Sequence, residues 1–338
     1  MPTPPWNSAP HSHAISRLAS SCVLEDIKAL ATEVEGDRYK IYERLPTLIA
    51  PHLEGALDQK LALCYSLASF PDYPVHFLLI GEPATVKTEL IEEARRIMPG
   101  AFYAGPRSTV SGLAANLDDG SLGLLARANG GLALLDELDK LPPRATKCLY
   151  EAMESGRITV NSGKLARELE SRFICIATAN PRGDILAKNA RDARKQLLDS
   201  VSAALLSRFH LVFVLRTPVG RELENTVSRI LIRSSRENPN IPFLRRYFET
   251  IKQLCPSIRC ELDPRSAPVK VARKFLARKI AASKRGRLGA PLSVRAAEAL
   301  RRLCVSSARM RLSPEVEDLD VRNAISIMKA SLVTWPGS

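Results

Sequence analysis

The sequence has no long apolar segment, and its first residues do not have the pattern of a secretory leader. None of its apolar runs reaches the roughly 18 residues that mark a membrane-spanning helix. The N-terminal run Met1-Pro2-Thr3-Pro4-Pro5-Trp6 has no apolar core of the kind that signal peptides carry. We therefore expect a soluble, intracellular protein with no membrane partner.

The sequence also lacks the cysteine and histidine spacing of a zinc site. Its 7 cysteines are scattered, only Cys255 and Cys260 lie close together, and no Cys or His pair completes a ligand set. Reduced thiols in an intracellular protein are the simplest interpretation. We predict no structural zinc, and we expect Cys175, which lies inside an apolar run, to be a small core residue.

Acidic residues are fewer than basic ones. The chain has 49 lysines and arginines against 36 aspartates and glutamates, which gives a net charge of +13. This balance favours an acidic partner such as nucleic acid and says nothing about the fold. The densest basic run, 270–287, alternates charged with apolar residues at helical spacing. That pattern favours a helix with a solvated basic face over a nucleic-acid patch.

Three regions of the chain differ in pattern. Residues 1–20 are rich in Pro, Ser and His and are predicted to form a flexible lead. Residues 21–217 begin with helical periodicity (21–72) and continue with alternating strands and helices, which predicts an α/β fold with a parallel sheet. Residues 218–338 show helical periodicity with no convincing strand, which predicts an α-helical domain. A chain of 338 residues is long enough for one large or two modest domains.

A candidate phosphate-binding turn follows the first predicted strand. The apolar run Val75 to Ile80 leads into a turn and then a helix, and the turn reads Gly81, Glu82, Pro83, Ala84, Thr85, Val86, Lys87 and Thr88. In such a layout backbone N–H groups and the lysine contact phosphates, and the hydroxyl contacts Mg²⁺. Val86 stands where the pattern has its second glycine, so the turn alone is equally compatible with a chance Lys-Thr pair.

A second apolar run, Leu132 to Leu135, ends at Asp136 and Glu137. At the end of a parallel strand Asp136 would hold the metal ion and Glu137 would polarise the attacking water. The pair could equally be solvated charges at the start of a helix, because Asp139 and Lys140 follow. The order of the two motifs, each after an apolar run of strand length, favours the catalytic interpretation.

Two further polar residues flank later strands. Asn180 follows the run Arg172 to Ala179, and an amide at this edge of an open α/β sheet can orient water near a γ-phosphate. The alternative is a turn cap before Pro181. Arg208 precedes the run Leu211 to Leu215 and could reach a phosphate bound by a neighbouring subunit. Equally, it could be one of many surface cations.

Together these segments resemble the minichromosome maintenance (MCM) family, the AAA+ motors of replicative DNA helicases. The similarity extends from about Leu24 to Leu332, and it is carried by Gly81 to Thr88, Gly130 to Lys140, Ala179-Asn180-Pro181, Leu205 to Phe209 and Ala308-Arg309-Met310-Arg311-Leu312-Ser313. The resemblance implies an AAA+ P-loop NTPase core over residues 21–217, followed by an α-helical lid over residues 218–338.

The resemblance also implies roles for single residues of a nucleotide site. ATP and Mg²⁺ are the expected cofactors. Lys87 and Thr88 match the Walker A pair that contacts the phosphates and the metal ion. Asp136 and Glu137 match the Walker B pair, and Asn180 matches the sensor-1 amide.

Two arginines match groups that act between subunits. Arg208 matches the arginine finger, and Arg295 matches the sensor-2 arginine of the lid. In this family both act on the ATP of the adjacent subunit, which implies a homo- or hetero-oligomeric ring, usually a hexamer, although an isolated chain could be a monomer. The resemblance further implies a DNA partner, ATP-driven DNA unwinding in replication, and a location in the nucleus of a eukaryote or the cytoplasm and nucleoid of an archaeon.

Departures from the family pattern leave a second interpretation open. Ala84 replaces a glycine, and Val86 replaces alanine or serine. A strained turn would store about 1–3 kcal/mol, which would weaken nucleotide binding about 5- to 150-fold. The family's N-terminal OB-fold and zinc-bearing half is also not found, which fits a naturally short homologue or an isolated motor region. The alternative to a motor is therefore a degenerate module that binds DNA or another MCM subunit.

The predicted hairpin before Asn180 is a candidate DNA contact. In the family a lysine on this hairpin enters the channel, but Ser162 occupies its place here and Lys164 lies two residues later. Because side chains two apart on a strand share a face, Lys164 could substitute for it, with Arg157 and Arg167 nearby. A solvated surface hairpin is the alternative.

Overall fold

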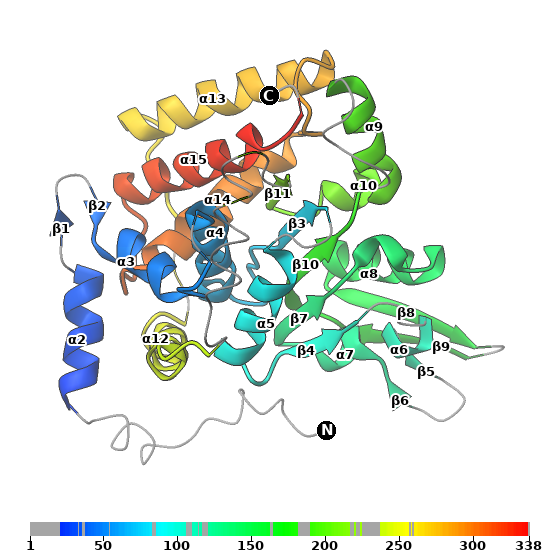
Figure 1. The fold of residues 1–338 in the computed structure, drawn as a ribbon, viewed down its shortest axis with the longest axis horizontal. Coiled ribbons are helices and arrows are strands. Elements are labelled where there is room, and N and C mark those ends of the chain that lie inside the picture. The colour runs from blue at the N-terminus through cyan, green and yellow to red at the C-terminus, as the bar shows by residue number, and fades with distance from the viewer. Residues whose placement is uncertain are drawn as a thin grey trace.

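The computed structural model describes residues 21–32, 34–35, 38–53, 55–82, 86–105, 110–113, 115–116, 121–162, 165–181, 190–216, 220, 224, 237–256, 258 and 260–336 (Figure 1). Several residues singled out above lie outside these ranges, namely Pro83, Ala84, Thr85 and Lys164. None of the helices in the described ranges is both long and apolar enough to cross a membrane.

A parallel sheet of five strands forms the centre of the molecule (Figure 1). Its strand order is β11-β3-β10-β7-β4, with bounds Leu211–Leu215 (β11), Phe77–Gly81 (β3), Phe173–Ala179 (β10), Gly131–Leu135 (β7) and Phe102–Ala104 (β4). The three central strands are buried along their whole length. Continuous apolar runs of this kind are typical of parallel strands covered on both faces. The predicted α/β core is therefore confirmed.

Two apolar cores cover the two faces of this sheet. One core contains side chains of the helices α3 (Ile41–Leu48), α4 (Leu57–Ala68), α5 (Lys87–Ile97) and α12 (Ile241–Leu254). The other contains side chains of α7 (Leu124–Arg127), α8 (Pro143–Ser155), α9 (Ala190–Ser200) and α10 (Ala203–Leu206). Alternate residues of β3 point into different cores, since Phe77 and Leu79 belong to the first and Leu78 and Ile80 to the second.

Small elements extend from this core. Helix α2 (Ser21–Thr32) and the short hairpin β1 (Val34–Glu35) and β2 (Arg38–Tyr39) precede it. Between β4 and β7 the chain forms α6 (Val110–Leu113) and a two-stranded sheet of β5 (Ala115–Asn116) and β6 (Ser121–Leu122). A longer antiparallel hairpin, β8 (Arg157–Ser162) and β9 (Leu165–Glu170), projects at one side of the sheet (Figure 1).

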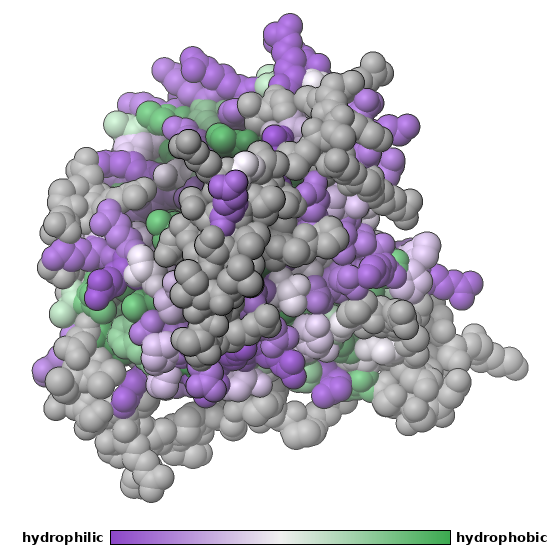
Figure 2. Space-filling model, viewed as in Figure 1, coloured by the Kyte–Doolittle hydropathy of each residue, from purple (hydrophilic) through white to green (hydrophobic). Residues whose placement is uncertain are grey.

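The C-terminal part is helical in the ranges described. Helix α12 is followed by α13 (Ala267–Lys284), α14 (Arg295–Met310) and α15 (Asp318–Val333). Side chains cap two of these helices: the Ser266 hydroxyl accepts the Val269 N–H, and Glu317 and Asp320 form a capping box. The core of α/β type is thus followed by the helical lid that the sequence predicts. Lysines and arginines of α13 are mostly exposed, and hydrophilic side chains lie over this helix (Figure 2), in agreement with the predicted solvated face.

Candidate nucleotide site and arginine cluster

Lys87 lies at the first position of α5, directly after the turn that follows β3. Its side chain is buried, and its ammonium group donates hydrogen bonds to the carbonyl oxygens of Gly81 at 2.7 Å and Glu82 at 2.6 Å. The lysine is thus held over its own turn, at the end of α5 where backbone N–H groups have no helical partner. Such a position suits a cation that meets phosphate oxygens.

Asp136 follows β7 at the same edge of the sheet. Its Oδ1 accepts a hydrogen bond from the Thr178 hydroxyl at 2.5 Å, and its backbone N–H donates to the Ala104 carbonyl at 2.9 Å. The Tyr103 hydroxyl lies 3.4 Å from Oδ2. One carboxylate oxygen is therefore fixed by the neighbouring strand β10, and the orientation of the whole group is set by the sheet.

Glu137 and Asn180 approach each other across the ends of β7 and β10. The Asn180 amide nitrogen lies 3.4 Å from Glu137 Oε1, which also accepts from Lys140 at 2.5 Å. Glu137 has a left-handed backbone, with φ 55° and ψ 54°, and its N–H donates to the Thr178 hydroxyl at 3.0 Å. Non-glycine residues in this conformation are uncommon and concentrate at functional sites.

The electrostatics of this edge fit a phosphate and a metal ion bound together. Burial lowers the pKa of Lys87 to about 8, although the carboxylates of Asp136, Asp139, Glu137 and Glu82 raise it. Three of those carboxylates, Asp136, Glu137 and Glu82, follow strand ends at this edge. A divalent cation would offset their charge and allow phosphate oxygens to enter.

A magnesium ion fits the residues present without a protein cage. Mg²⁺ is usually held by one or two carboxylates together with substrate phosphates and waters, and Asp136 with the exposed Thr88 provides one carboxylate and one hydroxyl. Within the described ranges there is no group of three or more His, Cys, Asp or Glu side chains that could hold a metal ion.

The prediction of backbone strain at Val86 is wrong. Val86 precedes α5 with φ −64° and ψ 1°, which is an ordinary conformation for a β-branched residue. Its side chain packs against the core that contains α4, α5 and α12. The second glycine position of the turn therefore needs no positive φ in this chain. Ala84, the other departure, lies outside the described residues.

Arg208 and Arg295 are joined by one carboxylate. Glu154, near the end of α8, forms an ion pair with the Arg208 Nη2 and a second with the Arg295 Nη2 at 3.0 Å. The Arg208 guanidinium also stacks on the Tyr150 ring, 4.3 Å from its centroid, and donates to the Tyr150 hydroxyl at 2.6 Å. Its side chain is only 6% exposed. Arg208 is therefore folded onto its own subunit.

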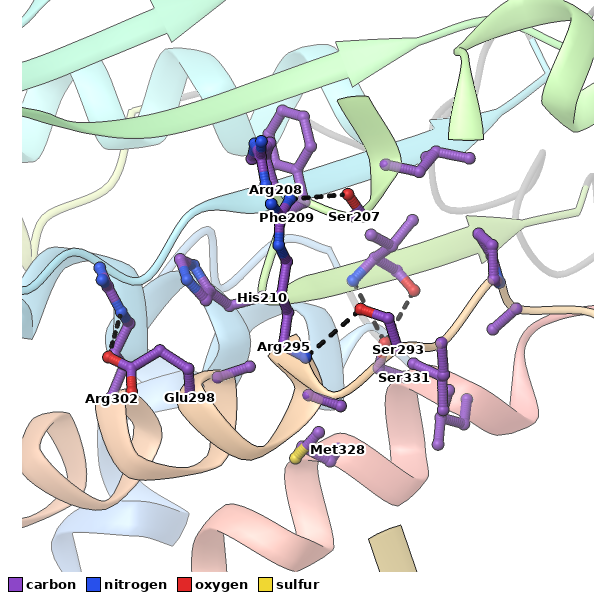
Figure 3. Close-up of a pocket in the computed structure, with 18 of the residues that line it drawn as sticks. Ser207, Arg208, Phe209, His210, Ser293, Arg295, Glu298, Arg302, Met328 and Ser331 are labelled. Carbon is purple, nitrogen blue, oxygen red and sulfur yellow. Dashed lines mark hydrogen bonds and ion pairs between the residues drawn. The ribbon is translucent and has the colours of Figure 1, made fainter. Parts of the chain in front are cut away.

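A cavity of about 250 Å³ lies at this junction of core and lid. Figure 3 shows Arg295, from the start of α14, reaching toward Ser207, whose hydroxyl lies 3.3 Å from Arg295 Nη1. Both arginines lie at the amino end of β11, whereas Lys87 follows the carboxyl end of the adjacent β3. The five paired residues between these ends span about 13 Å. The structure therefore brings the arginines to each other and not to Lys87 of the same chain.

Of the predicted DNA contacts, the two that the structure describes are not gathered on one face of the hairpin. The register of the hairpin pairs Arg157 with Glu170 and Val160 with Arg167, which puts the two arginines on opposite faces. Arg157 also lies 3.4 Å from the Glu168 carboxylate. Since β8 ends at Ser162 and Lys164 lies outside the described residues, the expectation for this lysine stays a prediction.

Sequence reasoning missed two residues that organise the sites. Thr178 fixes Asp136 and the backbone of Glu137, and Glu154 joins the two arginines. The sequence held a signal for Thr178, because a hydroxyl two residues before Asn180 shares its strand face. The structure adds the register, which pairs Ala177 with Leu135, next to Asp136. The sequence held no comparable signal for Glu154.

Comparisons with known proteins agree with this arrangement. Residues 26–235 match the MCM P-loop domain, and residues 242–332 match the MCM AAA-lid domain. The chain is similar to the minichromosome maintenance protein MCM of Saccharolobus solfataricus, with 29% identity over 320 residues that cover 86% of this chain and 45% of that protein. It is also similar to the DNA replication licensing factor MCM5 of Arabidopsis thaliana, with 28% identity over 331 residues covering 87% and 44%.

A third relative extends the comparison to animals. The DNA replication licensing factor Mcm5 of Drosophila melanogaster is 27% identical over 350 residues, which cover 94% of this chain and 47% of that protein. The chain thus spans about half the length of the curated relatives it matches. The resemblance predicted from the sequence is confirmed, and the chain belongs to the MCM family.

Proposed function

We propose that this chain is an ATP-driven motor of the MCM type that acts on DNA in replication. The observation that carries the proposal is the meeting of Lys87, Asp136, Glu137 and Asn180 at the carboxyl ends of β3, β7 and β10. Phosphate contact, metal binding and water activation each have a suitable group at this edge.

In the proposed mechanism the chain's own residues do most of the positioning. Lys87 exchanges the carbonyls of Gly81 and Glu82 for phosphate oxygens. Thr178 fixes Asp136, which together with Thr88 would hold a magnesium ion, and that ion would neutralise charge on the phosphates. Glu137 accepts the proton of the attacking water. Asn180, whose amide nitrogen lies 3.4 Å from Glu137 Oε1, aligns that water.

We propose further that Arg208 and Arg295 serve the nucleotide of an adjacent subunit in a ring, most simply a hexamer. Their place at the opposite edge of the sheet from Lys87 supports action in trans. Glu154 then acts as the counter-ion that holds the arginines until a neighbour's phosphate replaces it. An arginine supplied in this way is worth about 10³–10⁵ in rate in other phosphoryl-transfer enzymes.

The DNA-facing part of the proposal rests on the β8–β9 hairpin and on charge. Arg157 and Arg167 lie on the two strands of this hairpin, Lys164 comes between these strands in the sequence, and the net charge of +13 favours a polyanionic partner. Because the relatives include replication licensing factors of eukaryotes and an archaeal MCM protein, we propose that the chain acts in the nucleus of a eukaryote or in the cytoplasm and nucleoid of an archaeon.

A second candidate is a module that binds DNA or another MCM subunit without useful turnover. Two contacts favour it: Lys87 is held by its own turn, and Arg208 is held by Tyr150 and Glu154. Lys87 and Arg208 must leave these partners before Lys87 of one subunit and Arg208 of its neighbour can act on the same nucleotide.

One titration separates the two candidates. ATP with Mg²⁺ is added to the wild-type chain, to Glu137→Gln and to Lys87→Ala, and binding and phosphate release are measured at several protein concentrations. The motor predicts that Glu137→Gln keeps its affinity and loses hydrolysis, because the amide keeps the shape but not the charge, and that Lys87→Ala loses affinity. Absence of binding by the wild-type chain would refute the motor.

A further inference from the structure

A second cavity, of about 220 Å³, lies at the opposite edge of the sheet from the nucleotide site. Its walls include Gly131 and Leu132 at the amino end of β7 and Ile174 at the amino end of β10, and the register pairs Leu132 with Ile174. The other walls come from the ends of α4 and α5, from α12 and from α14. They are mainly apolar, with side chains such as Leu67, Phe70 and Met98.

Two cations line this apolar cavity. Arg309, from α14, is only 1% exposed and is the largest of the fully buried side chains among the described residues. Its Nε and Nη1 atoms are buried and make no hydrogen bond within the part of the chain that the structure describes. Lys252, from α12, is the second cation. The residues that line the cavity include no aspartate or glutamate.

The surroundings do not compensate the charge of Arg309. The guanidinium lies 4.7 Å from the centroid of the Phe70 ring, a contact that gives partial stabilisation. Burial lowers the pKa of Arg309 to about 10, so the group still carries its proton at neutral pH. Burial also raises the pKa of the nearby Cys255 thiol, which therefore supplies no negative charge. A buried cation without a partner is strongly unfavourable.

We propose that this cavity binds a small carboxylate carried on an apolar body, with Arg309 and Lys252 as its cationic contacts. The carboxylate would provide the negative charge that Arg309 lacks, and charge-assisted hydrogen bonds to a guanidinium are among the strongest in proteins. The apolar walls disfavour a phosphate ion, which needs many polar donors on all sides. The site is separate from the nucleotide edge, so it does not depend on the proposed ATPase activity.

The test uses benzoate as the probe and the whole chain as the protein. Benzoate is titrated by calorimetry at constant ionic strength, and inorganic phosphate is titrated in parallel. Saturable benzoate binding is expected in the wild type. Arg309→Met, which keeps the packing volume, should weaken it at least about tenfold, and Lys252→Met should weaken it to a smaller degree. The ¹⁵Nε resonance of Arg309 should shift with benzoate.

Arg302→Met is the matched control. Arg302 also lies on α14 and also stacks on an aromatic ring, 4.8 Å from the centroid of Tyr73, but it is paired with Glu298 at 3.2 Å. This variant should bind benzoate as the wild type does. The proposal is overturned if the wild type shows no saturable binding, or if Arg309→Met and Lys252→Met both bind with unchanged affinity. Tighter binding of phosphate than of benzoate would overturn the choice of ligand class.

Discussion

Acid is expected to destabilise the protein through two histidines at the amino end of β3 and β11. The Nδ1 of His76 accepts the Cys175 N–H at 3.0 Å, and the Nδ1 of His210 accepts the His76 N–H at 2.8 Å. The rings stack, with centroids 5.1 Å apart. Protonation at Nδ1 would break these bonds, so both imidazoles must be neutral in the folded state.

The magnitude follows from the pKa of His76. Burial, with a smaller contribution from Arg302, lowers this pKa to about 3, against about 6.5 in an unfolded chain. Between these two pKa values the unfolded state binds more protons than the folded state, so the free energy of unfolding rises with pH in this window. The contribution of neutral His76 to that free energy is lost progressively as pH falls below about 6.5. At pH 5 the loss for His76 alone is about 2 kcal/mol. His210, whose pKa burial also lowers, adds to it.

Urea unfolding at pH 7.5, 6.5, 5.5 and 5.0 measures this loss. His76→Asn is the informative variant, because its amide oxygen can accept the Cys175 N–H and does not titrate. We expect the wild type to lose at least about 2 kcal/mol between pH 7.5 and 5.0 and the variant to lose clearly less. An unfolding free energy that is flat over this range, or an equal loss in both proteins, would refute the assignment of neutral buried histidines.

Three further predictions concern the candidate sites. Thr178→Val keeps the shape of the side chain but removes the hydroxyl that fixes Asp136. The free energy of unfolding should fall by about 1–2 kcal/mol, and ATP turnover should fall while the oligomeric state stays the same. Unaltered turnover would show that Thr178 has only a structural role. Glu154→Gln should raise turnover severalfold by releasing both arginines, since a partly exposed ion pair is worth up to about 1 kcal/mol, whereas lower turnover would mean that Glu154 aligns them. Val86→Ala should change ATP affinity less than about twofold, because Val86 has an unstrained φ of −64°, and a large gain in a titration would contradict this.

The sequence predicted the parts of the structure that follow from short-range pattern. Apolar runs such as Val75 to Ile80 indicated the buried strands, and the polar residues that end them, Asp136 and Asn180, meet because parallel strands share one carboxyl edge. The side-chain contacts of Lys87 and Glu137 at that edge follow from this arrangement.

Long-range pairings were beyond the sequence. Glu154 and Arg295 are joined although 141 residues separate them, and the buried stack of His76 and His210 joins residues 134 apart. Neither follows from periodicity, because both depend on how α8, α14 and β11 pack. The conformation of Val86 was misjudged since the glycine requirement was inferred from a pattern and not from the backbone itself.

A mixing experiment tests the composite site most directly. Arg208→Ala subunits keep the Lys87 turn, and Lys87→Ala subunits keep the Arg208 side chain, so each alone should be inactive in ATP hydrolysis. Combined, neighbouring subunits can unite an intact turn with an intact arginine, and turnover should reappear and rise with total protein concentration as assembly proceeds. A strictly monomeric wild type that hydrolyses ATP at a concentration-independent rate, left untouched by Arg208→Ala, would contradict the account.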